Sequence, residues 1–162
     1  MTVKRPGKLL LFLFRIPAIL YRIGLGFILP RQMFLTTIGR KTGKPHRVVV
    51  DIIKHDKDND VYFVNAGWGL KSDWFRNLMT NPNVKVQIGR RKFNGKAIIL
   101  PLKEAEDILV EFINRHPNYV RLMMRVIGLE IRLNEEEIRS LVLEMPIVAI
   151  RSQYAYSYSA IR

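Results

Sequence analysis

The chain contains no cysteine, and this absence excludes several kinds of chemistry at once. Without cysteine there is no disulfide, no thiolate nucleophile and no cysteine-ligated metal, which is compatible with a reducing compartment. Histidine is also scarce. The three histidines, His46, His55 and His116, lack the spacing of metal ligands, so we expect no metal site.

Acidic residues are few compared with basic ones. The sequence has 14 aspartates and glutamates against 27 lysines and arginines, a formal net charge of +13. This excess predicts an anionic partner, such as a phosphate, a polyanionic cofactor, an acidic lipid or a nucleic acid. With 162 residues, 48% of them hydrophobic, the chain can bury one core. We expect a single domain over residues 1–151, followed by a tail over residues 152–162.

No uninterrupted apolar run is long enough to cross a membrane, because Arg15 and Arg22 lie within the apolar residues 9–29. An export signal is not expected either, since no small-residue cleavage site follows the basic start. The two arginines are seven residues apart and share one helical face. The pattern predicts an amphipathic helix within residues 1–30, lying either on the protein's own barrel or on a membrane surface.

The rest of the chain alternates between short strands and helices. β-Branched and apolar stretches bounded by turn residues predict strands at 32–38, 46–55, 61–66, 83–89, 92–101 and 146–151. Helical periodicity or helix boundaries predict four helices. They lie at 73–80, from 103 to the boundary at His116-Pro117, from that boundary to 127, and at 135–144. The pattern predicts an α+β fold, an antiparallel barrel with a short inserted helix and with further helices packed outside.

Two helix starts carry capping signals. Ser72 is expected to cap the short inserted helix, with Asp73 in its first turn. Asn134, with Glu137 three residues later, resembles a capping box for the last helix.

The stretch "TTIGRKTGKPHR" places a basic turn between two apolar strands. Gly39 and Gly43 permit unusual backbone conformations, and the turn can present cations and backbone amides to a phosphate. A solvated turn that serves only solubility is the alternative. The candidate anion-binding residues of the turn and of the strand that follows are Arg40, Lys41, Thr42, His46 and Arg47.

A second candidate region is "NAGWGLKSDW", which places small residues around Trp68 between a strand and a helix. Small residues there allow a planar ring to approach the backbone closely. Trp74, with Leu78 four residues later, is also typical of a core anchor. No acid–base dyad or serine–histidine pair is evident, so we leave catalytic residues unassigned and expect a cofactor to carry any chemistry.

Together, "LTTIGRKTGKPHRVVVDII", "VNAGWGLKSDWFRNLMTNPNVKVQIGRRKF" and "EMPIVAI" resemble the nitroreductase and quinone reductase family that depends on the deazaflavin coenzyme F420. The resemblance covers most of the chain. It implies a split β-barrel related to flavin mononucleotide (FMN)-binding oxidoreductases. It also implies hydride transfer from reduced F420 to a quinone or a nitro compound.

The resemblance also implies where the coenzyme binds. Arg40, Lys41 and Thr42 would hold its phosphate and acidic tail, and His46 and Arg47 would extend this clamp. The residues implied around the ring are Val48, Val49, Val50, Asp51, Asn65, Ala66, Gly67, Trp68, Asp73, Trp74 and Asn77. For Asp51 a second interpretation stays open, that of a buried partner for an arginine.

Two rival functions follow from the same residues. One keeps the fold but replaces F420 by FMN. The other is a non-enzymatic basic barrel that binds nucleic acid or an anionic membrane. Basic residues gather in turns rather than among aromatics on a strand face, which favours the enzyme over nucleic-acid binding. We expect a cytoplasmic monomer or homodimer, with peripheral contact to the inner membrane face as an open alternative.

Overall fold

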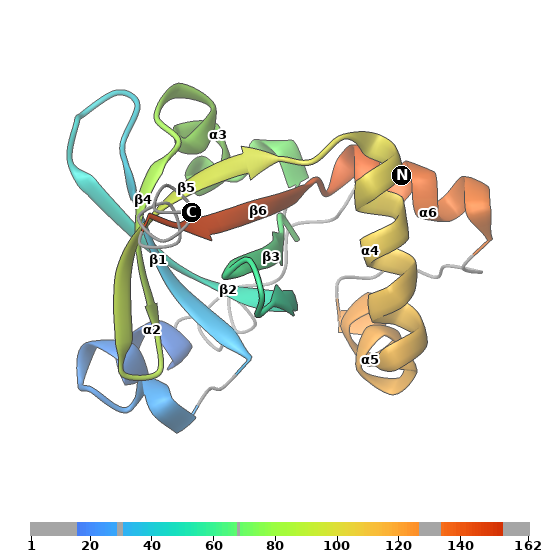
Figure 1. Cartoon of the computed structure of the whole chain (residues 1–162), viewed down its shortest axis with the longest axis horizontal. Coiled ribbons are helices and arrows are strands. Elements are labelled where there is room, and N and C mark those ends of the chain that lie inside the picture. The colour runs from blue at the N-terminus through green and yellow to red at the C-terminus, as the bar shows by residue number, and fades with distance from the viewer. Residues whose placement is uncertain (1–15, 29–30, 68, 127–133, 154–162) are drawn as a thin grey trace.

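The computed structural model describes residues 16–28, 31–67, 69–126 and 134–153. Its centre is a closed antiparallel barrel with the strand order β1-β2-β3-β6-β5-β4, in which β4 also pairs with β1 (Figure 1). The strands are β1 (Gln32–Ile38), β2 (Pro45–Asp56), β3 (Val61–Asn65), β4 (Asn83–Ile88), β5 (Arg91–Ile99) and β6 (Ile147–Ser152).

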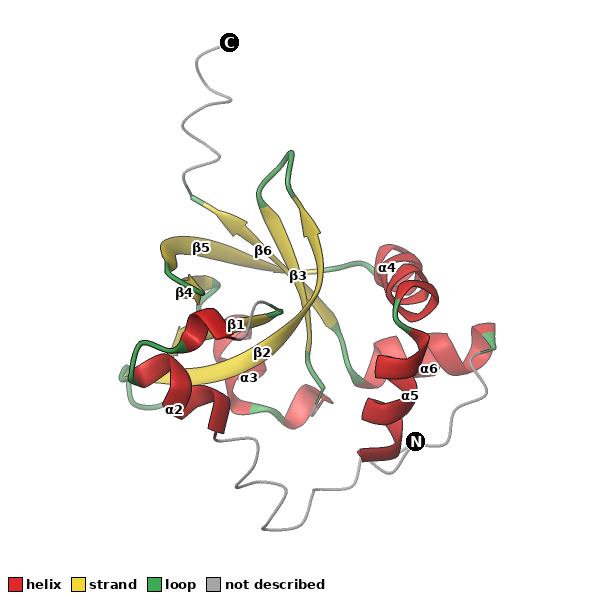
Figure 2. Cartoon of the chain, turned by 90° about the horizontal axis from the view of Figure 1, so that it is seen from below, coloured by secondary structure: helices red, strands yellow, loops and turns green. Residues whose placement is uncertain are grey.

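Helices pack outside the barrel and form two groups by their order in the chain. One group comprises α2 (Ile16–Arg22), the 3-10 turns η1 (Gly26–Ile28) and η2 (Gly69–Lys71), and α3 (Asp73–Thr80). The other comprises α4 (Leu102–Arg115), α5 (Pro117–Val126) and α6 (Glu135–Glu144), all between β5 and β6 in the chain. Figure 2 shows this second group together on the side of the barrel away from α2.

Two hydrophobic cores explain why several strands are apolar on both faces. Tyr62 and Val64 of β3 point into the barrel, whereas Val61 and Phe63 pack outward against α4 and α6. Successive side chains of a strand point to opposite faces, so each core takes every second residue. The barrel is thus joined to its helical layer by apolar packing rather than by loops alone.

The predicted fold class is confirmed, and the predicted strands match the observed ones to within two residues at their ends. The helix at 73–80 matches α3, and Asn134 is confirmed as the N-cap of α6 by the Glu137 amide, which donates to Asn134 Oδ1 at 2.8 Å. The prediction for Ser72 was wrong in its chemistry. Ser72 occupies the N-cap position, but its hydroxyl donates backwards to the Gly69 carbonyl at 2.7 Å.

The helix predicted within residues 1–30 ends earlier than expected. In the described part it stops at Arg22, because Gly24 adopts φ 84° and closes the helix. The Gly24 amide donates to Tyr21 and the Leu25 amide to Leu20, the pair of bonds typical of a Schellman ending. Residues 1–15 lie outside the described residues, as does the tail from 154 onward; β6 itself continues through the buried Ser152.

Strand β2 changes neighbours along its length, and this positions the site. Residues 45–51 pair with β1, whereas pairing with β3 begins only at Ile52, where a bulge also occurs before Lys54. Within the described residues, the first half of β2 therefore has no strand on its second edge. The backbone of this free edge borders the cavity described next.

Candidate functional site

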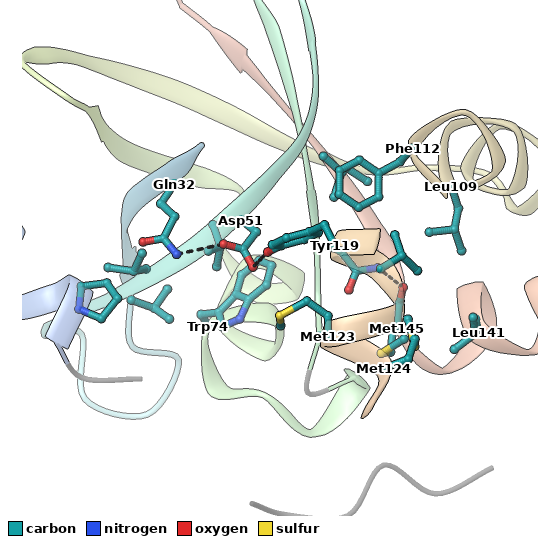
Figure 3. Close-up of a pocket in the computed structure, with 18 residues that line it drawn as sticks. Gln32, Asp51, Trp74, Leu109, Phe112, Tyr119, Met123, Met124, Leu141 and Met145 are labelled. Carbon is teal, nitrogen blue, oxygen red and sulfur yellow. Dashed lines mark hydrogen bonds between the residues drawn. The ribbon is translucent and has the colours of Figure 1, made fainter. Parts of the chain in front are cut away.

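An elongated cavity of about 200 Å³ lies between the free half of β2 and the helical layer (Figure 3). Its barrel end is lined by consecutive β2 residues together with Trp74 of α3. Its helical end is lined by apolar side chains of α4, α5 and α6, including Phe112 and Met123. Such a cavity suits a flat or extended apolar ligand. The cavity-lining residues among those predicted from the sequence are Val48, Val49, Val50, Asp51, Asn65, Gly67 and Trp74.

The run of adjacent β2 residues along the cavity follows from the free edge. Val48 and Val50 pack towards the barrel core, yet both also border the cavity, as does Val49 between them. In an ordinary paired strand only alternate residues would face one ligand. Here the exposed backbone edge gives a planar ligand access to main-chain N–H and C=O groups.

A polar chain crosses the cavity at Asp51. The Tyr119 hydroxyl donates to Asp51 Oδ2 at 3.0 Å, and the Gln32 side-chain amide donates to Asp51 Oδ1 at 3.0 Å. Among the described residues, the hydrogen-bond partners of Asp51 are a tyrosine and a glutamine rather than the arginine of the second interpretation. Figure 3 shows Tyr119 and Asp51 pointing at one another across the cavity.

The environment of Tyr119 keeps its hydroxyl protonated. Burial raises the pKa of Tyr119 above its usual range, and the neighbouring Asp51 carboxylate raises it further. A protonated phenol beside a carboxylate is a hydrogen-bond donor. The Tyr119 hydroxyl can therefore exchange its hydrogen bond to Asp51 for one to an oxygen of a bound ligand.

The basic turn precedes the cavity-lining part of β2 and is docked onto α3. The Arg40 guanidinium donates to Asp73 Oδ1 at 2.9 Å and to Asn77 Oδ1 at 3.0 Å, and its backbone amide also donates to Asn77. Asn77 is buried and donates in turn to Thr37 of β1 at 3.2 Å. The Arg40 contact lowers the pKa of Asp73, so the pair is ionised at neutral pH.

The turn's backbone is less available to a phosphate than the sequence suggested. The amides of Gly39 and Gly43 are used inside the turn, and the Lys44 amide donates to the Thr42 hydroxyl at 3.3 Å. Together with the engaged Arg40 amide, these bonds remove most of the anticipated amide nest. Its exposed side chains remain, namely those of Lys41, Thr42, Lys44, His46 and Arg47.

The other predicted site residues occupy different places. Ala66 is fully buried, and its amide donates to the Pro146 carbonyl, so it supports the site from behind. Asn65 borders the cavity and donates to the Met145 carbonyl at 3.1 Å. Trp68 lies outside the described residues. Asp73 and Asn77 fix Arg40 instead of lining the cavity.

Sequence reasoning missed the side of the cavity that the helical layer provides. Gln32 of β1 was missed, and so were Phe112, Tyr119, Met123 and Met124 of the helical layer. Their helices come late in the chain, and no local spacing says that α5 returns to face β2. The one available signal was the "RHP" boundary, which places Tyr119 in the first turn of α5.

The fold and the site define a barrel protein with an apolar cavity and an exposed cationic turn. A family model for F420H(2)-dependent quinone reductase matches residues 21–136. The chain belongs to this family, which confirms the resemblance drawn from the sequence.

Individual relatives share smaller parts of the chain. F420H(2)-dependent quinone reductases from two strains of Mycobacterium tuberculosis are 30% identical over 71 residues, which is 42% of this chain. The match spans 46% of their own length, about half.

Solved structures agree in fold. An F420-H2 dependent reductase gives a TM-score of 0.51 at 22% identity, covering 75% of this chain and 94% of that one. A protein of unknown function from Agrobacterium tumefaciens gives a TM-score of 0.54 at 16% identity, covering 86% of this chain and 56% of that one. At these identities the likeness concerns the fold alone.

Proposed function

We propose that this protein binds coenzyme F420 and transfers a hydride from its reduced form to a quinone. Family membership supports this, as do the names of the mycobacterial relatives. The observation that carries the proposal is the continuity of three features along β2. Exposed cations at its start lead to a free backbone edge, which leads to an apolar cavity. A polyanionic tail attached to a flat ring matches that order.

The residues fit the coenzyme in distinct ways. Lys41, His46 and Arg47 are exposed side chains that can follow the acidic tail, while Arg40 shapes the turn through α3. The edge of β2 and Trp74 would hold the ring, with Gly67 leaving room beside Asn65. Gln32 Oε1 is buried with no described partner, so a ring N–H reaching this end would satisfy it.

Reduced F420 supplies the hydride when bound; this chain's residues supply position and a hydrogen-bond donor. Tyr119 is the group we assign to the acceptor, because its protonated hydroxyl borders the cavity beside Asp51. It would donate its hydrogen bond to the acceptor oxygen, on which the hydride transfer develops negative charge, and the proton that completes the quinol would come from solvent. Asp51 would stabilise the donor orientation until the acceptor replaces it. Nitro compounds present similar oxygens and form a second acceptor class to screen.

Peripheral membrane contact is part of the proposal, because quinones of membranes are lipid-soluble. Ile19, Ile23 and Ile28 are 48%, 63% and 55% exposed, next to Pro17, which lines the cavity. Exposed Arg22 lies among them, as expected for an anionic lipid surface. Tyr21 instead packs on the barrel, stacked on Phe34. The helix would therefore contact the barrel with one face and the lipid surface with the other. No helix in the described segments is long and apolar enough to cross a bilayer.

A titration of the purified protein with oxidised F420, followed by fluorescence, tests the coenzyme assignment. Replacing Lys41 and Arg47 together by alanine should weaken binding by about 100-fold or more, since each charge-assisted contact contributes roughly 1.5–3 kcal/mol. The matched control is Lys92→Ala with Lys96→Ala, two exposed cations of β5 that lie outside the site. Equal affinity of both double variants, or tighter binding of FMN than of F420, would contradict the proposal.

A further inference from the structure

A second cavity of about 210 Å³ adjoins the first and has its own cation. The two share four lining residues, Gln32, Asp51, Phe112 and Tyr119, so the two cavities meet at the Asp51 chain. Arg31, just before β1, lines only the second cavity, together with Ile28 and Ile52. Each cavity is smaller than the roughly 300–1,000 Å³ of a drug-sized site. Neither cavity alone therefore has room for both a coenzyme ring and an acceptor.

Arg31 is held in place without losing its charge. Its guanidinium donates to Nε2 of His116, the residue between α4 and α5. Burial and the adjacent Arg31 lower the pKa of His116, so the ring is neutral and accepts this bond. No described carboxylate forms an ion pair with Arg31. Its remaining donors are available at the cavity, and arginine has five in all.

The negative charge of Asp51, where the two cavities meet, explains why a cation is needed in the second cavity. A quinone that accepts a hydride becomes a quinol anion, and Asp51 would place a carboxylate close to this new charge. Like charges in a partly buried site disfavour each other, whereas a guanidinium nearby offsets both. Arg31 borders the same cavity as Asp51 and Tyr119, so it can act on the acceptor oxygen from the side opposite the coenzyme.

We propose that the second cavity is the acceptor subsite, in which Arg31, held by His116, binds an acceptor oxygen and favours its anionic form. This inference rests on the proposed quinone reductase function. It adds Arg31 as a residue that determines whether the neutral or the anionic form of the acceptor binds more tightly. The ligand class is an aromatic dione or its quinol anion.

Binding to the coenzyme-free protein tests the inference without turnover. The probes are 2-methyl-1,4-naphthoquinone, which is neutral, and 2-hydroxy-1,4-naphthoquinone, which is an anion at neutral pH. Quenching of tryptophan fluorescence reports binding, since Trp74 lines the adjoining cavity. Arg31→Met should weaken binding of the anion by about 10-fold or more and that of the neutral probe by less than about 3-fold. Arg31→Lys should retain part of the anion preference, and Asp51→Asn should increase it.

Arg139→Met is the matched control, because Arg139 is an exposed arginine of α6 that lines neither cavity. If Arg31→Met and Arg139→Met bind the anion equally, or if Arg31→Met weakens both probes alike, the Arg31 assignment is wrong. That outcome, in a wild-type protein that still reduces quinones with reduced F420, leaves the proposed function standing. A wild type that neither binds F420 nor reduces quinones overturns both.

Discussion

At the scale of single residues, Arg40 and Lys41 are neighbours with different expected roles. Arg40 links the turn to Asp73 and to buried Asn77, whereas Lys41 is exposed. Arg40→Ala should lower the free energy of unfolding by about 1–2 kcal/mol, since a hydrogen bond contributes ~0.5–1.5 and an exposed ion pair ~0–1 kcal/mol. Lys41→Ala should change it by less than about 0.5 kcal/mol. Urea unfolding measures both; equal losses would show that the Arg40 contacts add no stability.

Tyr119 gives a second prediction about one atom. Tyr119→Phe removes the hydroxyl that points at Asp51 but keeps the ring contact with Phe112, whose centroid is 6.0 Å away. Loss of a positioned hydrogen-bond donor to the developing charge should lower kcat for quinone reduction by about 100-fold, while F420 affinity changes little. Steady-state kinetics and the fluorescence titration separate these effects. Unchanged kcat would remove Tyr119 from the mechanism.

The site residues that could be predicted are those on contiguous sequence. Val48 to Asp51 follow the basic turn directly, and the family resemblance places them beside the coenzyme. The sequence does not predict the roles of Gln32, Arg31 and Tyr119. These residues are distant from the cavity-lining part of β2 in the chain, and only long-range packing brings them to the site. The partner of Asp51 could not be predicted for the same reason. The sequence shows a carboxylate in an apolar strand, but it does not show whether a phenol or a guanidinium from elsewhere in the chain binds it.

At the scale of elements, the far end of the barrel carries a polar cluster with its own pH dependence. Arg91 at the start of β5 donates to both oxygens of Asp60, at 2.9 and 2.5 Å, and to the Tyr62 hydroxyl at 2.9 Å. The Arg91 hydrogen bond lowers the pKa of Asp60 in the folded state. A lowered carboxyl pKa gives stability that is present above the unfolded value, about 3.9, and is lost as the pH falls through the folded value.

Arg91→Met should therefore lower stability at pH 7, and the gap to wild type should narrow as the pH falls below about 4. Urea unfolding at several pH values measures the gap. Lys103→Met is the control, because its partner Asp107 lies one turn away on exposed helix α4 and the pair contributes little. A gap that stays constant down to about pH 2.5 would mean that Asp60 ionisation is not linked to folding.

Strands were easier to predict than helix ends. Alternation along β3 and β6 follows from two cores on opposite faces of one sheet, which leaves a clear apolar signature. Helix ends depend on single backbone conformations instead. Gly24 closes α2 through φ 84°, and Ser72 prefers the Gly69 carbonyl to the helix amides. Such choices are set by a few atoms and leave no periodic pattern.

At the scale of the whole molecule, the net charge of +13 and the exposed side chains of Ile19 in α2, Ile23 just after it and Ile28 in η1 predict binding to anionic vesicles. Replacing Ile23 and Ile28 by glutamate should abolish co-sedimentation with phosphatidylglycerol vesicles, through lost apolar burial and added like charge. The control is Ile98→Glu, since Ile98 is 52% exposed but lies on β5, outside the site. If the control loses vesicle binding equally, charge alone drives adsorption and α2 has no special part.

We propose that the coenzyme lies along β2 from the basic turn to the cavity. Amide chemical shifts of the labelled protein, titrated with oxidised F420, test this placement most directly. We expect the largest changes at Lys41, Val49 and Gly67 and at the Trp74 indole, with no comparable change around Arg91. Changes that gather on β4 and β5, with β2 and Trp74 unaffected, would contradict it.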